Sequence, residues 1–202
     1  MPKKRTAILI SGRGSNMRAL IEAAKAPDYP ADIALVLSNV ETAEGLARAR
    51  DAGIPTKVIS HKVFASREEF DIAVDAALTD ARIDLVCLAG FMRIQSEAFV
   101  RKWQGRMLNI HPSLLPAFPG TRVHEQVLAA GVTRSGCTVH FVVPELDAGP
   151  IVAQASVPVL PGDTPQTLAA RVLVEEHKLY PLALQMLADG KVALVGGRAT
   201  FY

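Results

Sequence analysis

Short apolar runs alternate with longer amphipathic patterns through the first half of the chain. The strand-like runs fall at residues 6–10, 31–38, 56–60 and 83–89, and the helical patterns at residues 15–26, 42–52 and 67–81. This alternation is typical of βαβ units, in which consecutive strands lie parallel in one sheet. The pattern therefore predicts an α/β fold of the Rossmann-like type, with an open, doubly wound, mostly parallel sheet and helices on both faces.

The pattern changes after a strand-like run at residues 107–111, because Pro112, Pro116 and Pro119 follow in close succession. A segment so rich in proline continues neither a helix nor a central strand. The rest of the chain is predicted to form a helix near 122–130, strands at 135–143 and 151–159, a helix at 165–188 and a β-like end near 191–202. No repeat or long polar linker separates the halves, so residues 1–202 are predicted to form one domain.

Composition and charge argue against a nucleic-acid-binding, membrane-spanning or secreted protein. Of the 202 residues, 50% are hydrophobic, and the formal net charge is only +2. The chain can therefore bury one substantial core, but it lacks the clustered basic excess of a nucleic-acid-binding protein. No apolar stretch approaches the roughly 20 residues that span a bilayer, and the run at residues 7–10 is shorter than a signal-peptide core. We expect a cytoplasmic protein without a nucleic-acid or membrane partner.

The only two cysteines, Cys87 and Cys137, each lie inside a strand-like run and form no CxxC pair. Cys137 and His140 have a CxxH spacing, but residues three apart on a strand point to opposite faces, and no second pair of ligands accompanies them. We expect buried, reduced thiols and no metal site.

The first loop, Ser11–Asn16, joins the first predicted strand to the first predicted helix, where doubly wound sheets bind anions. Its sequence matches neither the dinucleotide nor the ATP-binding glycine pattern. Gly12 and Gly14 allow close backbone approach, Ser15 supplies a hydroxyl and Asn16 an amide, which together suit a single phosphate. The alternative is an ordinary tight turn with a capping residue.

Two polar side chains end the strand-like run at 107–111. Alternation along a strand places Asn109 and His111 on the same face, where an amide donor and an imidazole could stabilise an oxyanion and supply a proton. Asp147, in a turn-rich loop between two later strands, would join them only if the fold brings it beside His111. The alternatives are a structural histidine and an ordinary loop carboxylate.

A further candidate is the segment 88–94, in which a buried strand runs into Gly90 and then into an apolar stretch that contains Arg93. Exposed backbone N–H and C=O groups there would suit the edge of a flat heteroaromatic ligand. The alternative is a simple strand end with a solvated arginine.

Taken together, these segments resemble the phosphoribosylglycinamide formyltransferases, a family of folate-dependent enzymes of purine synthesis. The matching segments are ISGRGSN (10–16), SREEFD (66–71), LAGFMRI (88–94), NIHPSLLPAFPG (109–120), GCTVHFV (136–142), ELDAGPIV (145–152) and EEHKLYP (175–181). NIHPSLLP followed by LDAG is specific to the formyltransferase fold, and GSN in the first loop narrows the resemblance to the glycinamide enzymes.

The resemblance implies a role for each matching residue. The implied catalytic residues are Asn109, His111 and Asp147. The implied ligands of the ribonucleotide substrate are Gly14, Ser15 and Asn16 for the phosphate and Glu176 for the ribose hydroxyls. The implied folate-binding residues are Arg67, Met92, Arg93, Ile94, Gln95, Asn109, Val143 and Leu146. Two positions depart from the family, since Gln95 replaces a common leucine and Leu173 replaces a common lysine or glutamine near the substrate.

The implied reaction transfers the formyl group of the co-substrate 10-formyltetrahydrofolate to the amine of 5-phosphoribosylglycinamide, without a metal, in a monomer or homodimer. Asn109 and a protonated His111 would stabilise the tetrahedral oxyanion, and Asp147 would keep His111 charged. The resemblance also favours a cis Leu115–Pro116 bond.

Three other readings compete with this one. A methionyl-tRNA formyltransferase would need a basic appended domain, whereas this chain ends at Tyr202 with a net charge of +2. A formyltetrahydrofolate hydrolase would carry an N-terminal regulatory domain, whereas the sheet here begins at residue 6. A noncatalytic folate-binding or phosphometabolite-binding protein would not need Asn109, His111 and Asp147 together.

Overall fold

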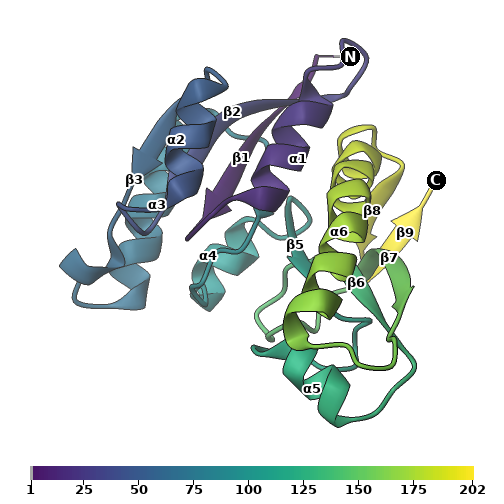
Figure 1. Ribbon diagram of the computed structural model, residues 1–202. Coiled ribbons are helices and arrows are strands. Elements are labelled where there is room, and N and C mark those ends of the chain that lie inside the picture. The colour runs from purple at the N-terminus through teal and green to yellow at the C-terminus, as the bar shows by residue number, and fades with distance from the viewer. Residues whose placement is uncertain (1) are drawn as a thin grey trace.

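A seven-stranded sheet with the strand order β3-β2-β1-β4-β5-β6-β7 forms the centre of the computed structural model, which describes residues 2–202 (Figure 1). Its strands are β1 (Lys4–Ile10), β2 (Ala31–Ser38), β3 (Thr56–Val58), β4 (Leu85–Leu88), β5 (Met107–His111), β6 (Arg134–Phe141) and β7 (Ile151–Pro158). The helices are α1 (Ser15–Ala24), α2 (Glu44–Asp51), α3 (Arg67–Asp80), α4 (Glu97–Lys102), α5 (Val123–Ala129) and α6 (Pro165–Ala188), with a short 3₁₀ helix η1 (His61–Val63). A separate hairpin joins β8 (Val192–Val195) to β9 (Arg198–Phe201).

The sheet is mostly parallel, as the sequence predicts. Strands β3, β2, β1, β4 and β5 pair in parallel, whereas β6 pairs antiparallel with both β5 and β7. The boundaries of β2 and α6 agree with those predicted. The N-terminus of α6 is well defined because Thr164 forms a capping box with Thr167 and Pro165 occupies the first turn. Helix α4 was not predicted from the sequence.

Two apolar layers pack against the two faces of the sheet. One joins Met17 and Leu20 of α1 to Leu168 and Tyr180 of α6, together with residues of α2 and α5. The other joins Phe70 and residues further along α3 to the residues of α4. Figure 1 shows α1 and α6 lying along the sheet, with α6 beside β6 and β7. Helices thus cover both faces, and the doubly wound class is confirmed.

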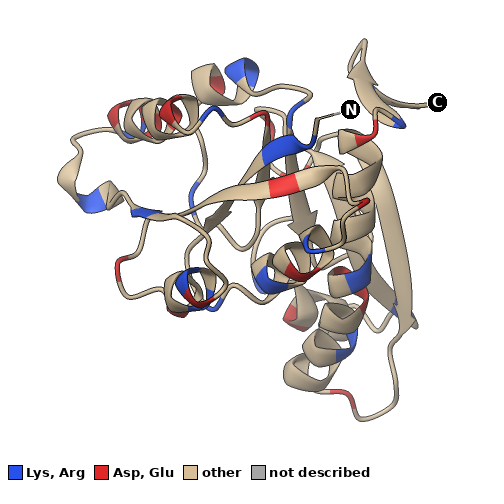
Figure 2. Ribbon diagram, turned by 90° about the horizontal axis from the view of Figure 1, so that it is seen from above, with Lys and Arg blue, Asp and Glu red and all other residues tan. Residues whose placement is uncertain are grey.

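Positive and negative residues are intermingled over these elements. Figure 2 shows Lys and Arg close to Asp and Glu over much of the ribbon, in keeping with the net charge of +2. Within residues 2–202, no helix is both long and apolar enough to cross a membrane. Both cysteines are buried and unbonded to each other, as expected, and burial raises the pKa of each thiol to about 12.

The topology brings three loops to one edge of the sheet. Because β1, β4 and β5 are neighbours and run in parallel, the segments that follow them all leave from their carboxyl ends. Successive strands are added to one side of β1 as far as β3 and to its other side from β4 onward, and ligands of doubly wound proteins bind in the crevice where the strand order reverses in this way. The residues singled out from the sequence after β1, β4 and β5 therefore meet at this edge.

Candidate active site

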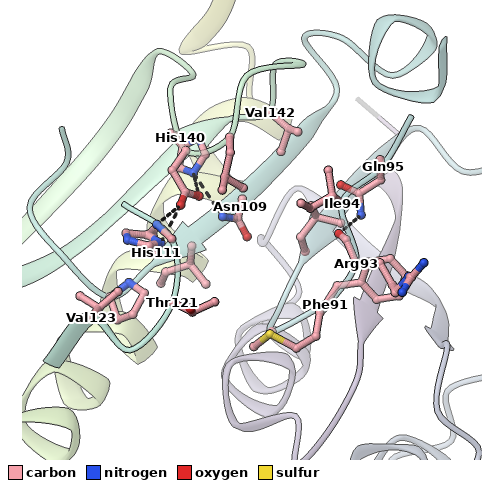
Figure 3. A pocket seen from close by; sticks show the side chains of 18 of the residues that line it. Phe91, Arg93, Ile94, Gln95, Asn109, His111, Thr121, Val123, His140 and Val142 are labelled. Atoms are coloured by element: carbon pink, nitrogen blue, oxygen red, sulfur yellow. Dashed lines mark hydrogen bonds and ion pairs between the residues drawn. The ribbon is translucent and has the colours of Figure 1, made fainter. Parts of the chain in front are cut away.

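A cavity of about 690 Å³ opens at this edge of the sheet (Figure 3). Its walls come from the segment after β4, from the end of β5, from the start of α5 and from the loop between β6 and β7. The predicted site residues among its lining are Met92, Arg93, Ile94, Gln95, Asn109, His111, Val143, Leu146 and Asp147. The fold thus brings together residues 55 positions apart in the chain, from Met92 to Asp147.

His111 and Asp147 face each other in the cavity, and both side chains are almost fully buried. The Nδ1 atom of His111 lies 3.5 Å from Oδ2 of Asp147. The Nε2–H of His111 donates to the carbonyl of Phe118 at 2.8 Å, which leaves Nδ1 as the nitrogen that faces the carboxylate. A protonated His111 would therefore have an acceptor for each N–H.

Asp147 is held by the backbone of the proline-rich segment. The N–H of Gly120 donates to Oδ2 of Asp147 at 2.8 Å, so the same oxygen faces both a backbone donor and His111. Asp147 has a positive φ of 51°, a conformation that non-glycine residues adopt mainly at sites where other interactions enforce it. A Cβ atom at Gly149 would lie 1.7 Å from the carbonyl oxygen of Phe141. Only glycine lets this loop lie so close to β6.

Asn109 is oriented by a neutral histidine on the next strand. Register pairs Asn109 of β5 with His140 of β6, and Nδ2 of Asn109 lies 3.2 Å from Nε2 of His140. Nδ1 of His140 donates to the carbonyl of Phe141 at 2.9 Å, so Nε2 is the acceptor in the neutral ring. Burial lowers the pKa of His140, and this outweighs the opposing effects of the Phe141 carbonyl and of Asp147. One N–H of the Asn109 amide is thus fixed, and the other is available to a ligand.

The turn after β5 is supported by β6 and β7. The peptide bond between Leu115 and Pro116 is cis, which confirms the prediction. Thr138 of β6 donates its hydroxyl to the carbonyl of Ser113 at 2.7 Å and accepts from the N–H of Leu115 at 3.1 Å. Gln154 of β7 donates to the carbonyl of Leu115 at 2.9 Å. These bonds fix the turn that carries Phe118 and Gly120 to the site.

The opposite wall of the cavity is the segment that follows β4. Figure 3 shows Phe91, Arg93, Ile94 and Gln95 across the cavity from Asn109, His111 and His140. Residues 92–95, which we call the platform, belong to no helix or strand. Met92 and Ile94 are 73% and 56% exposed, and Leu146 at the cavity mouth is 60% exposed. Exposed apolar side chains gathered around a cavity are typical of a binding site for an aromatic ligand.

The predicted phosphate loop lies outside the lining of this cavity. Gly14 has a φ of 69° and immediately precedes α1. Asn16 donates its amide N–H to Oε2 of Glu176 at 2.7 Å, so two of the implied ribonucleotide ligands, 160 residues apart, do meet. Burial raises the pKa of Glu176, and the bond from Asn16 partly opposes that rise. A partly buried polar contact therefore joins α1 to α6 next to Gly14.

One implied position remains apart from these sites. Arg67 begins α3 and is exposed, and it is not among the cavity-lining residues. Leu173, which departs from the family and has no implied role, is half-buried on α6, three residues before Glu176.

The sequence predicts no role for His140 beside Asn109, because its spacing indicates only a candidate metal-ligand pair with Cys137. Among residues 2–202, no group of three or more His, Cys, Asp and Glu side chains could hold a metal ion. The contact between His140 and Asn109 follows from the antiparallel pairing of β5 and β6, which no local sequence pattern indicates.

The sheet, its carboxyl-edge cavity and the converging amide, imidazole and carboxylate define an enzyme of the doubly wound α/β class. The chain belongs to the formyl transferase family, whose model matches residues 4–184.

Individual relatives support this assignment. A phosphoribosylglycinamide formyltransferase of Escherichia coli K12 is 46% identical over 187 residues, which cover 93% of this chain and 88% of the relative. The solved structure of glycinamide ribonucleotide transformylase 1 from Symbiobacterium toebii has a TM-score of 0.95 at 43% identity, and the match covers 98% of this chain and 94% of that one.

A longer relative is the human trifunctional purine biosynthetic protein adenosine-3, which is 56% identical over 192 residues, or 95% of this chain. This chain spans only 19% of the length of that relative and of those from cattle and chicken.

Proposed function

We propose that this protein transfers the formyl group of 10-formyltetrahydrofolate to the amine of 5-phosphoribosylglycinamide in purine biosynthesis. The observation that carries the proposal is the convergence of Asn109, His111 and Asp147 on a cavity whose other wall is an open backbone platform. The relatives named as phosphoribosylglycinamide formyltransferases support the same reaction. The cavity of about 690 Å³ is within the size range of sites for small molecules and cofactors.

The proposed reaction is a direct displacement at the formyl carbon. The substrate amine forms a bond to that carbon and gives a tetrahedral species with a negatively charged oxygen. The bond from carbon to N10 of the folate then breaks, and the proton lost by the amine is delivered to N10. The folate is consumed as a co-substrate, and the balance requires no oxidant, metal or covalent enzyme intermediate.

Three side chains divide this work. Asn109 donates its free amide N–H to the developing oxyanion, and His140 holds that amide in orientation. His111, as a cation, offers Nδ1–H as a second donor and proton source, because its Nε2–H is bound to Phe118. Asp147 faces Nδ1, where its negative charge favours the cationic ring and assists the transfer of the amine proton.

The two substrates are assigned to adjoining regions. Met92, Arg93, Ile94, Gln95, Val143 and Leu146, together with Arg67 outside the cavity, bind the folate. Gly14, Ser15, Asn16 and Glu176 bind the ribosyl phosphate.

We propose further that residues 1–202 act as one formyltransferase domain, as a monomer or homodimer, in the cytoplasm.

The direct experiment is a spectroscopic assay of folate deformylation with and without 5-phosphoribosylglycinamide. Deformylation that requires the ribonucleotide and yields its formylated product supports the proposal. Deformylation by water alone would identify a hydrolase, and methionyl-tRNA as the required acceptor would identify the tRNA enzyme. Binding of both small molecules without turnover would leave a noncatalytic binding protein.

Substitution of Gly14 tests the phosphate loop. A Cβ atom there would lie 3.0 Å from the Cε atom of Met17 and 3.2 Å from Gly45, in a left-handed backbone conformation. Gly14→Ala is expected to raise the dissociation constant of 5-phosphoribosylglycinamide about tenfold or more and to change that of the folate less than twofold. Gly53→Ala is the matched control, because it introduces a side chain at a similar left-handed φ of 75° just beyond α2, where a Cβ meets nothing within 4 Å. Calorimetry on folded protein measures both constants, and equal losses for the two ligands would contradict the assignment.

A further inference from the structure

The platform, residues 92–95, is an unpaired stretch of backbone fixed at both ends by side chains. Among residues 2–202, no backbone hydrogen bond joins these four residues to another backbone group. The N–H of Met92 donates to the hydroxyl of Ser11 at 2.8 Å, and the N–H of Ser96, just beyond the platform, donates to Oδ2 of Asp71 at 2.5 Å. Between these anchors the carbonyl of Arg93 accepts from Nε2 of Gln95 at 2.8 Å, and among residues 2–202 no other hydrogen bond engages the backbone of residues 93–95, so those groups are available to a ligand.

Asp71 is an unusual residue for its place in the fold. It follows the core residue Phe70 on α3, and its side chain is buried, with only 3% of the residue exposed. Its Oδ1 atom is buried and has no hydrogen-bond partner. Burial raises the pKa of Asp71, although the bonds from Ser96 and the charge of Arg67 oppose the rise. A buried carboxylate with an unpaired oxygen is costly to the fold, so stability of α3 does not account for it.

Ser11 forms the second anchor as part of a small network. Its hydroxyl donates to Oδ1 of Asn39 at 2.6 Å while it accepts from Met92. Asn39 in turn contacts Nδ1 of His61 at 3.1 Å, and the N–H of Ser11 donates to the carbonyl of Gly90 at 3.2 Å. The bond to Asn39 therefore fixes the direction of the Ser11 hydroxyl, so that its oxygen can accept from the N–H of Met92.

We propose that Asp71 and Ser11 are positioning residues that hold the platform outside any helix or strand, so that its backbone can bind the heteroaromatic edge of the folate. The proposal rests on the proposed function, since it concerns the folate side of the same site. Neither residue lines the cavity, so both act through the backbone that they hold. Loss of either anchor lets the platform sample conformations that cannot bind, which reduces folate affinity by the fraction of time spent in them.

Asp75 provides a matched control one turn further along α3. Its carboxylate also joins α3 to the α4 region, because Oδ2 accepts from Lys102 at 2.5 Å and Oδ1 accepts from the indole N–H of Trp103 at 3.0 Å. It thus makes the same kind of contact between the same two elements, but it does not touch the platform. A purely structural role for Asp71 predicts the same behaviour for both residues.

The experiment compares D71A, D71N, D75A and S11A by titration with 10-formyltetrahydrofolate and, separately, with 5-phosphoribosylglycinamide, alongside thermal unfolding. D71A is expected to weaken folate binding about tenfold with ribonucleotide binding changed less than twofold. D71N should restore folate binding to within about threefold of the original, because its amide oxygen can still accept from Ser96. D75A should lower the unfolding temperature without a selective effect on folate.

Several results would overturn the proposal. One is an equal loss of both ligands in D71A, and another is a folate loss in D75A as large as that in D71A. If D71A does not fold, S11A must by itself weaken folate binding about tenfold, and an unchanged constant refutes the proposal. Failure of the unmodified protein to bind folate at all is a different outcome, because it removes the proposed function itself.

Discussion

Replacing Asp147 by asparagine is expected to lower kcat by about a hundred- to ten-thousand-fold, the range in which general acid–base groups contribute. The asparagine side chain has nearly the same shape and can still accept the N–H of Gly120, which Asp147 binds at 2.8 Å. The change therefore removes the negative charge 3.5 Å from Nδ1 of His111 and leaves the loop in place. The dissociation constants of both substrates should change little, because the lost interaction belongs to the transition state.

The dependence of this effect on His111 tests whether the two residues act as a unit. The double variant H111A/D147N should lose much less activity than the product of the two single losses, since each substitution removes the same ion pair. Single-turnover kinetics would measure the chemical step directly. D84N is a suitable control, because among residues 2–202 the carboxylate of Asp84 accepts only the backbone N–H of Arg5, at the opposite edge of the sheet. Multiplicative losses, or near-normal turnover in D147N, would exclude the coupling.

The parts of the fold that could be predicted from the sequence are those with long or sharply bounded patterns. Strand β2 contains the continuous apolar run 33–37, and the start of α6 is marked by its cap Thr164 and by Pro165. Helix α4 has only six residues, too few for its periodicity to be distinguished from an irregular segment. Its capping residue, Ser96, was the one local signal available.

The candidate site was predictable only as far as it is local. Asn109 and His111 share a strand, so their common orientation follows from alternation. The approach of Asp147 depends on the antiparallel return of β6 and β7, and the role of His140 depends on the register that places it opposite Asn109. The sequence of a buried strand is a similar apolar run whether the neighbouring strand is parallel or antiparallel to it. The sequence pattern therefore could not indicate either contact.

Asp71 illustrates a different limit. It occupies a regular position in a helical pattern, within a segment that matches the formyltransferases, and nothing local separates it from a solvated helix carboxylate. Its contact is a backbone N–H 25 residues away. Because any residue supplies such an N–H, no pairing of side chains in the sequence could have indicated the partner.

Removal of the Asn109 amide is the second substitution with a large expected effect. N109A should lower kcat by about a hundred- to a thousand-fold, as the loss of a single oxyanion donor does in other enzymes. The amide has two N–H groups, and one of them is bound to Nε2 of His140 at 3.2 Å. The substitution therefore removes the second N–H, which is the group that Asn109 offers to the oxyanion. Because the oxyanion exists only in the transition state, the folate dissociation constant should change much less than kcat.

Substitution of His140 tests whether the Asn109 amide must be held in a fixed orientation or need only be present in the site. H140A leaves Asn109 in place but lets its amide rotate, so kcat is expected to fall about tenfold, less than in N109A. In an N109A background the further loss of His140 should cost less than about threefold, because no amide remains to be oriented. A full additional tenfold loss in the double variant would show that His140 acts independently of Asn109, for example through Asp147, whose Oδ1 lies 3.9 Å from Nε2 of His140. The coupling energy from pre-steady-state rates of the four proteins decides between these two roles.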